Sequence, residues 1–455
     1  MNAIKLSIFA NRIDAICAEM GVTLQKSAFS PNIRDRLDYS CAIFDARGEL
    51  CAQAAHIPVH LGSMAFAMRD IVVAFDWSPG DMVVVNDPYK GGTHLPDVTM
   101  VAPFFDEGKL LGFVANRAHH ADIGAESPGS MPLSSSLMEE GLVIEPSLLV
   151  KNSQIIESYF DDLMSHMRNR DESSGDFIAQ IAANRRGLQR LSDLLEKIGA
   201  ADYQESLASL NEYAASLARA SLKDVQDGEY LFSDVLDDDG QGHQDIQIQV
   251  RVVVENGKVV VDFDGSAAQV AGNINCPLSV TAAAVYYVFR CLMPAHIPAC
   301  AGTFRHIHLQ APEGSLLNAR YPAAVAAGNV ETSTRIVDVI MGALGKAIPE
   351  QMASASHGSM NNVAVGSNSP GNHWDYYETI GGGMGASPGR PGPGGVQTHM
   401  TNTLNTPVEV LEQRFPLRIL KYQIRRNSGG KGQFAGGDGL VREFQFLQSA
   451  EFTLL

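Results

Sequence analysis

The sequence contains no hydrophobic run long enough to cross a bilayer. The longest apolar stretch, around residues 280–289, holds only about half of the roughly 20 residues that a spanning helix needs. The first segment, MNAIKLSIFANRIDAICAEMG, has polar interruptions and is not followed by a small-residue cleavage pattern. We therefore interpret it as an amphipathic helix, not a signal peptide, and we expect no membrane insertion.

The sequence has few cysteines, and their spacing does not suggest metal-binding or redox pairs. The six cysteines form no CxxC pair, and several lie within apolar runs, where a reduced thiol behaves as a small hydrophobic group. They are Cys17, Cys41, Cys51, Cys276, Cys291 and Cys300. This pattern favours a reducing compartment, so we predict a cytoplasmic protein.

Positive charge is also in short supply. The chain has 34 Lys and Arg against 51 Asp and Glu, a formal charge of -17. Nucleic-acid binding depends on clustered cations that neutralise phosphates, so this class of partner is excluded. With 455 residues, of which 45% are hydrophobic, the chain has more material than one core uses, and we expect two or three packed domains.

Known nucleotide-binding motifs are missing. Gly345-Lys346 has Ile340 where a P-loop needs glycine and Ala347 where it needs a hydroxyl. Gly381-x-Gly383-x-x-Ala386 resembles a dinucleotide fingerprint, but Ser-Pro-Gly-Arg-Pro follows where a helix should begin. Neither pattern therefore supports a nucleotide site in this chain.

The hydrophobic patterns predict an α+β, or mixed α/β, multi-domain fold with largely antiparallel sheets. We place an N-terminal mixed domain at 1–150, a helical segment at 151–227 and a C-terminal α+β domain at 228–455. Residues 3–20 have helical spacing that ends at Gly21. Asn256-Gly257 between two apolar runs predicts a β-hairpin, and helices are expected at 279–292 and 332–344.

The segment NDPYKGGTHLPD, two apolar runs around DEGK, and HHAD form the strongest candidate site. Folding this hairpin about Glu107-Gly108 sets Asp97 opposite Ala118. The fold would gather ligand-type side chains at one hairpin end: His94, Asp97, His119, His120 and Asp122. Such a set suits Mn, Fe or Zn, although strand alternation cannot decide which histidine faces the ion. The alternative is that these residues cap strand ends.

Other polar segments are open to two interpretations. Asp38, in the strip DRLD, could be a carboxylate at a strand entrance or part of a solvated turn. His56 and His60 have helical spacing interrupted by Pro58, which favours a structural role over a place near ligand.

The glycine- and proline-rich loop 381–395, together with the polar segments 372–378 and 397–402, would suit an uncharged polar substrate. We expect Gly383 to need a φ value that only glycine adopts cheaply, so that Gly383→Val would impair catalysis more than stability. The alternative is a loop that only caps the sheet.

Several long strings resemble the hydantoinase B/oxoprolinase family across nearly the whole chain. They are RLDYSCAIFDARGEL, AQAAHIPVHLGSM, NDPYKGGTHLPDVTMVAPFF, NRAHHADIGAESPGSMP, YETIGGGMGA, HMTNTLNTPVEVLE and SGGKGQFAGGDGLVREFQF. The resemblance implies a hetero-oligomer with a hydantoinase A type ATPase subunit, which would hold ATP and Mg. Family members usually continue beyond the GGDG strand, so we expect this chain to be a piece of a longer one.

The resemblance also implies an activity. Relatives open five-membered cyclic amides with ATP, as N-methylhydantoinase and 5-oxoprolinase do, or carboxylate acetone and acetophenone. In the acetone carboxylase relatives the B-like subunit carries manganese. The implied function is ring opening of a lactam or hydantoin; a carboxylase subunit and a non-catalytic scaffold are the alternatives.

The resemblance further implies site residues. The implied metal ligands are His94, Asp97 and His119. His120 and Asp122 would then lie next to the ligands, and together with Asp38 they are the candidates for general base. The residues of the glycine loop and the polar segment after it, independently of the resemblance, give the candidates for substrate contact, which are Gly382, Gly383, His399 and Asn402.

Overall fold

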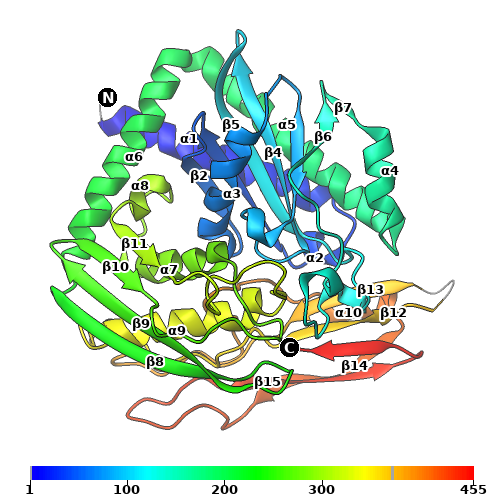
Figure 1. The fold of residues 1–455 in the computed structure, drawn as a ribbon, viewed down its shortest axis with the longest axis vertical. Coiled ribbons are helices and arrows are strands. Elements are labelled where there is room, and N and C mark those ends of the chain that lie inside the picture. The colour runs from blue at the N-terminus through cyan, green and yellow to red at the C-terminus, as the bar shows by residue number, and fades with distance from the viewer. Residues whose placement is uncertain (1–2, 370–372) are drawn as a thin grey trace.

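The computed structural model describes residues 3–369 and 373–455, and it has the mixed α+β, multi-domain architecture with mostly antiparallel sheets that the sequence predicts (Figure 1). Asn372, the first residue of one polar segment considered above, lies outside the described residues. Within them, no helix combines the length and apolarity that crossing a membrane requires.

The N-terminal part is built on a seven-stranded sheet in the described chain, with the order β2-β1-β5-β4-β3-β6-β7. Its strands are β1 (Tyr39–Asp45), β2 (Leu50–Ala55), β3 (Met82–Val85), β4 (Asp97–Asp106), β5 (Lys109–His119), β6 (Ser147–Lys151) and β7 (Gln154–Ile155). Successive residues of β1 face opposite sides, as the period of a strand requires. Cys41 and Ile43 belong to one hydrophobic cluster, whereas Ala42 and Phe44 belong to another.

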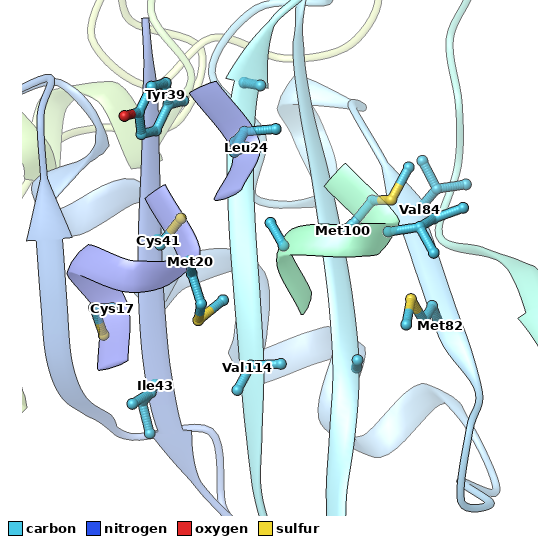
Figure 2. Close-up of a cluster of buried hydrophobic side chains, with 14 of the residues drawn as sticks. Cys17, Met20, Leu24, Tyr39, Cys41, Ile43, Met82, Val84, Met100 and Val114 are labelled. Atoms are coloured by element: carbon cyan, nitrogen blue, oxygen red, sulfur yellow. The ribbon is translucent and has the colours of Figure 1, made fainter. Parts of the chain in front are cut away.

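Helices cover both faces of this sheet. The helices of this half are α1 (Ala3–Ser27), α2 (Pro31–Arg34), α3 (His60–Ala74), α4 (Glu157–Ser165), α5 (Arg170–Ile198) and α6 (Ala200–Leu222). α1 and α5 supply the cluster that contains Cys41, and Figure 2 shows Cys17, Met20 and Leu24 of α1 over β1. α3 covers the other face. The helical segment therefore shares one hydrophobic core with the N-terminal sheet.

The first helix does not end at Gly21 as predicted from sequence, because Gly21 is a packing position. It is buried inside α1, and a Cβ there would lie 3.0 Å from Cε2 of Tyr39. The absence of a side chain thus lets the helix approach β1 closely, and this benefit outweighs the helix-ending tendency of glycine.

The C-terminal part has a four-stranded sheet, ordered β11-β10-β9-β8, whose apolar face packs on two helices. The elements are β8 (Gly228–Asp238), β9 (Gln244–Glu255), β10 (Lys258–Asp262), β11 (Ile307–Gln310), α7 (Leu278–Leu292), α8 (Ala301–Phe304) and α9 (Ser333–Leu344), preceded by a π-helical turn at Gly328–Thr332. The predicted hairpin is confirmed: Asn256 and Gly257 both have positive φ, 50° and 74°. These are the values of a type I′ turn.

The last third of this part forms two smaller sheets. They contain β12 (Asn362–Ser367), β13 (Trp374–Thr379), β14 (Leu417–Arg425), β15 (Gly439–Phe446) and β16 (Glu451–Leu454), with α10 (Val408–Arg414) between β13 and β14. β13 meets the N-terminal half: Arg36 donates to the carbonyl of Tyr377, and Arg168 pairs with Asp375 at 3.1 Å. The candidate site lies at this meeting of the two halves.

Candidate metal centre and neighbouring cavities

The β4–β5 hairpin brings the predicted ligands together. Asp97 pairs with His119, one residue away from the predicted partner Ala118. The difference arises at an irregularity between Phe104 and Phe105, where the register shifts by one. A bulge of this kind adds a residue to one strand and leaves no reliable trace in the sequence pattern. The predicted convergence at the hairpin end holds.

His94, Asp97 and His119 form a compact buried cluster in which one ligand atom from each residue lies within 4.8 Å of the others. The Asp97 carboxylate is central: Oδ2 is 3.4 Å from Nε2 of His94, and Oδ1 is 3.5 Å from Nδ1 of His119. Thr93 donates a hydrogen bond to the same carboxylate. All of these side chains are buried, so the cluster has been taken out of bulk water.

The hydrogen bonding of the imidazoles fits a metal ion. Nδ1 of His94 lies 3.3 Å from the carbonyl oxygen of Ala326, which can only accept, so this nitrogen carries the proton and Nε2 keeps a lone pair. Nε2 of His94 and Nε2 of His119 are both buried without a hydrogen-bond partner in the described structure. Buried polar atoms normally have partners, and a ring fixed through its other nitrogen is typical of histidine metal ligands.

The electrostatics of the cluster also favour a cation. Burial works to raise the pKa of Asp97, but His94 and His60 more than offset this and hold that pKa well below its usual range. Burial lowers the pKa of His119, which keeps its ring neutral. Burial lowers the pKa of His94 as well, but the Asp97 carboxylate outweighs it and raises that pKa. The ionised carboxylate of Asp97 and the neutral imidazole of His119 are donors that Mn, Fe or Zn takes, and a bound cation would replace the proton that Asp97 favours on His94.

His60 lies at the candidate metal cluster, although the sequence favoured a purely structural role for it. It begins α3, and its Nε2 lies 3.4 Å from Oδ2 of Asp97, while its Nδ1 lies 3.0 Å from the hydroxyl of Ser40. It therefore orients the central carboxylate. In the sequence, only the helical spacing of His56 and His60 indicated this position for His60, and Pro58 between them made the indication weak.

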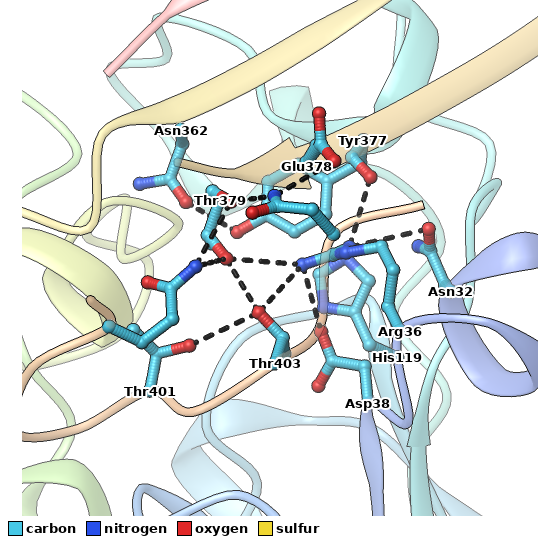
Figure 3. A network of polar contacts seen from close by, with 12 residues as sticks. Asn32, Arg36, Asp38, His119, Asn362, Tyr377, Glu378, Thr379, Thr401 and Thr403 are labelled. Carbon is cyan, nitrogen blue, oxygen red and sulfur yellow. Dashed lines mark hydrogen bonds and ion pairs between the residues drawn. The ribbon is translucent and has the colours of Figure 1, made fainter. Parts of the chain in front are cut away.

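Arg36 and Asp38 lie buried beside the cluster. The interpretation of the strip DRLD as a solvated turn is therefore wrong. The side chain of Arg36 is fully buried and lies 3.6 Å from Asp38. Figure 3 shows Arg36 among Asn32, Asp38, Tyr377, Thr379 and Thr403, with hydrogen bonds or ion pairs to each. The ring of Tyr377 in turn stacks on His119, with centroids 4.6 Å apart.

A cavity of about 20 Å³ lies between these groups, and its walls include Asp38, His60, His94, Asp97 and His119. A cavity of that size holds about one water molecule or ion. Of the candidate bases, the structure brings Asp38 to this cavity.

His120 and Asp122 point elsewhere, although they follow His119 closely in sequence. Nε2 of His120 lies 2.9 Å from Oε1 of Gln180, and its ring packs on Phe177. Asp122 accepts hydrogen bonds from the backbone amides of Gly124 and Arg168. The alternation of the strand end sends them into the contact with the helical segment, a choice that sequence alone leaves open.

The glycine loop borders a cleft of about 820 Å³, lined by Gly382 and Gly383 together with the segment 428–437. Gly383 does not have the positive φ expected for it; instead, a Cβ there would lie 1.9 Å from the carbonyl oxygen of Gly437. Gly382 would meet the ring of His357 at 2.5 Å. The glycines therefore allow two loops to pack, so the expected effect of Gly383→Val moves from catalysis toward stability.

The two remaining substrate candidates separate. His399 is buried, lines a different cavity of about 410 Å³, and pairs through Nε2 with Asp338 at 3.0 Å. Asn402 is exposed. Residues 399 and 402 share a polar sequence segment, but of the two only His399 is buried, because a chain without regular structure has no fixed periodicity.

The comparison with known families agrees with these features. The model of the hydantoinase B/oxoprolinase family matches residues 2–455. The chain belongs to the hydantoinase B/oxoprolinase family. Its similarity extends to 5-oxoprolinase 1 of Arabidopsis thaliana, with 38% identity over the whole of this chain and 37% of that protein. The chain thus spans little more than a third of that relative.

Solved structures show the same fold. The ATP-dependent caprolactamase from Pseudomonas jessenii matches with a TM-score of 0.91 and 29% identity, covering 99% of this chain and 79% of that one. The acetone carboxylase of an ATP-dependent acetone carboxylation system matches with a TM-score of 0.88 over 98% of this chain and 63% of that one. At 18% identity, the latter likeness concerns the fold alone.

Proposed function

We propose that this chain is the metal-binding B subunit of an ATP-dependent cyclic amidase, which opens the ring of a lactam or hydantoin. The observation that carries the proposal is the buried cluster of His94, Asp97 and His119, whose free imidazole nitrogens and ionised carboxylate fit a divalent transition metal. Manganese, zinc and iron all suit this donor set. The similarity to a caprolactamase and to 5-oxoprolinases supports the amide substrate.

The partner in this proposal is a hydantoinase A type ATPase subunit in the same cytoplasmic complex. An unactivated lactam is a poor electrophile, and phosphorylation of its carbonyl oxygen by the partner gives an imidate-like phosphate ester whose carbon water can attack. The ring C–N bond of the adduct then breaks, with the nitrogen taking a proton and leaving as the amine, and hydrolysis of the resulting acyl phosphate releases phosphate and the carboxylate. In the described part of this chain we find no P-loop, which supports such a division of labour. The metal, when bound, supplies Lewis acidity and lowers the pKa of a bound water.

The residues around the cluster have separable tasks. His94, Asp97 and His119 hold the ion, and His60 and Thr93 orient the Asp97 carboxylate. Asp38 lies at the cavity with its carboxylate next to Arg36. It is the candidate general base, since it is the nearby carboxylate that the proposed ligand set leaves free. Stacking of Tyr377 on His119 excludes water from one side of the ring.

The test is metal content together with coupled turnover. Elemental analysis of the purified chain should give about one transition metal per chain, and His94→Ala and His119→Ala should each lose it, because a site with two protein ligands binds far more weakly. His308→Ala, a change on the exposed face of β11, is the control and should keep the metal. Full metal content in either ligand variant would contradict the proposed ligands.

Turnover is then measured with the A-type partner. ATP hydrolysis should be stimulated by hydantoin, 5-oxoproline or caprolactam, and neither subunit alone should open a ring. Stimulation by acetone or acetophenone in the presence of bicarbonate, with none by the cyclic amides, would replace the proposal with a carboxylase subunit. Stoichiometric metal with no stimulation by either group would leave a scaffold role for this chain.

A further inference from the structure

The segment 323–327 lies beside the metal cluster and forms neither a strand nor an α-helix. Val325 and Ala326 are nevertheless fully buried, with exposed fractions of 0% and 1%. Buried backbone N–H and C=O groups need hydrogen-bond partners, and a segment without regular structure does not provide them itself. Groups from other parts of the chain must therefore hold this backbone in place.

Glu140 holds two consecutive amides of the segment. Its Oε1 accepts hydrogen bonds from the backbone N–H of Val325 at 2.8 Å and of Ala326 at 2.9 Å, and from the hydroxyl of Ser134 at 2.8 Å. The Glu140 side chain is buried, and its Oε2 has no partner in the described structure. One carboxyl oxygen thus replaces the backbone acceptors that a helix or a sheet would offer.

The carbonyl of Ala326 connects this contact to the metal cluster. Its oxygen lies 3.3 Å from Nδ1 of His94, the ring nitrogen that carries the proton. Because peptide groups are planar and rigid, only the two backbone torsion angles of Ala326 separate the amide that Glu140 holds from this carbonyl. The position of the His94 partner therefore depends on the position of the Ala326 amide.

The rest of the segment is held through its carbonyls. The hydroxyl of Tyr89 donates to the carbonyl of Ala323 at 2.7 Å, and the side-chain amide of Asn275 donates to the carbonyl of Ala324 at 3.0 Å. Both of these contacts come before Ala326 in the chain. Loss of the Glu140 contact would thus loosen the part of the segment next to His94 without detaching the part before it.

A carboxyl group is a costly choice at this position. Burial raises the pKa of Glu140 to about 7, so the folded chain disfavours its charged form. Buried acids with raised pKa values are enriched at functional sites, and through Ala326 the contacts of this one reach a proposed metal ligand.

We propose that Glu140 is a positioning residue for the metal site: its Oε1 fixes the Ala326 backbone, whose carbonyl holds the His94 ring with Nδ1 protonated and Nε2 free for the ion. The inference rests on the proposed function, because it takes His94 as a ligand. Glu140 is not itself a ligand. Its role requires an acceptor oxygen at the right reach and does not require a negative charge.

Two conservative variants separate reach from charge. Glu140→Gln keeps the length of the side chain and an acceptor oxygen but removes the charge. Glu140→Asp keeps the carboxyl group but is one methylene shorter, so it falls short of the two amides. Glu139→Asp, at the exposed neighbouring position, is the matched control. If Glu140→Asp fails to fold, Glu140→Leu takes its place, since it fills a similar volume without an acceptor.

The first readout is the His94 ring proton in the metal-free full chain. NMR of isotope-labelled histidine detects the Nδ1–H and its exchange with water, and His94→Gln assigns the signal. The unaltered chain, Glu140→Gln and Glu139→Asp should show a slowly exchanging Nδ1–H. In Glu140→Asp the signal should be lost or should exchange at least about tenfold faster, the effect of one buried hydrogen bond. A purely structural role for Glu140 would not change this proton in a folded variant.

The second readout is the affinity for Mn²⁺, measured by competition with a chelator. Groups that orient a metal-ligating histidine contribute about 10–100-fold to metal affinity. Glu140→Asp should therefore bind Mn²⁺ more weakly by about that factor, whereas Glu140→Gln and Glu139→Asp should bind it as the unaltered chain does.

Three results would overturn the inference: no Nδ1–H on His94 in the unaltered chain, an unchanged His94 signal in folded Glu140→Asp or Glu140→Leu, or loss of the signal in Glu140→Gln. Failure of the proposed function is seen separately. If the unaltered chain binds no metal but the His94 proton responds to the variants as expected, the function is refuted and the positioning of His94 stands. Metal-dependent ring opening, with the same His94 signal and the same Mn²⁺ affinity in every variant, would do the reverse.

Discussion

Glu140 is a buried carboxyl group whose protonation is linked to folding. Its Oε1 accepts from the backbone amides of Val325 and Ala326 and from the hydroxyl of Ser134, while Oε2 is buried without a partner in the described structure. Burial raises its pKa to about 7, against those three hydrogen bonds, which lower it. Because the folded pKa lies above the unfolded one, its contribution to stability is present at low pH. That contribution is lost as the pH rises toward 7.

Replacement of this carboxyl by a neutral amide should therefore help more at high pH. We expect the melting temperature of Glu140→Gln relative to the unaltered chain to be higher at pH 8 than at pH 5. The linked free energy is roughly 3 kcal/mol for a shift of this size. Thermal unfolding at the two pH values measures it. Glu139→Gln, at the neighbouring exposed position, should show the same difference at both. A pH-independent effect of Glu140→Gln would show that Glu140 is ionised throughout.

Arg36 is the cation that ties the strip DRLD to β13. It is fully buried, and it donates to Tyr377 and lies beside Asp38. Arg36→Met should lower the free energy of unfolding by about 3 kcal/mol, because it leaves a buried carboxylate without its partner. Arg34→Met is the matched control, since Arg34 is 41% exposed and paired at the surface with Asp35. It should cost no more than about 0.5 kcal/mol in denaturant titrations. Equal losses would mean that Arg36 acts only through local packing.

At the residue scale, the sequence predicted the gathering of the candidate ligands better than it predicted their surroundings. His94, Asp97 and His119 come together because one hairpin carries them, and hairpins are encoded locally. His60 and Tyr377 reach the same cavity from two other elements, Arg36 pairs with Asp38 from the turn after α2, and no local pattern places them there. The direction of His120 was open for a different reason: a side chain at a strand end follows the register, which a single bulge can shift.

At the element scale, the loop that carries Thr93 and His94 depends on a close approach to α3. Gly91 has a φ of 93°, and a Cβ there would lie 2.2 Å from the Cα of Ala67. Its carbonyl also accepts from Arg117. The hairpin tip offers a matched glycine: Gly108 has a φ of 79°, with no atom within 4 Å of its would-be Cβ. The two positions share a left-handed backbone conformation, but only Gly91 is packed closely against another element.

Alanine at these two glycines should separate strain from packing. Gly108→Ala should cost about 1 kcal/mol, the price of a left-handed conformation in a residue with a side chain. Gly91→Ala should cost several times as much and should also weaken metal binding, because the loop must move away from α3. Urea unfolding and metal titration measure the two effects. Equal costs, with unchanged metal affinity, would contradict the role assigned to this contact.

Element boundaries were predictable where the local pattern was also the packing pattern. The hairpin at Asn256-Gly257 and the helix near 279–292 meet that condition, and both are confirmed. α1 does not, because Gly21 serves a contact with a strand that lies later in the sequence. The 381–395 loop was correctly predicted to lack regular secondary structure, but Gly382 and Gly383 serve close contacts with His357 and Gly437 that no local pattern reveals.

At the scale of the whole molecule, the candidate metal cluster lies where the two halves meet. The proposed ligands come from the N-terminal half, while Tyr377 of β13 stacks on His119 and Ala326 accepts from His94. Arg168 and Asp375 form a second tie between the halves. An ion bound only by the folded state stabilises all the structure that its site requires. Metal binding should thus stabilise the β4–β5 hairpin and also the contact between the two halves of the molecule.

Hydrogen exchange followed by mass spectrometry can test this coupling. Addition of Mn²⁺ to the metal-free chain should slow amide exchange in 92–99 and 117–120, and equally in 374–379 of β13, because Tyr377 keeps its place only while His119 is fixed. The distant hairpin of β9 and β10 serves as the internal control and should not change. In His119→Ala, Mn²⁺ should protect none of these segments. If Mn²⁺ slows amide exchange only in the β4–β5 hairpin, the ion stabilises that hairpin and leaves the contact with β13 unaffected.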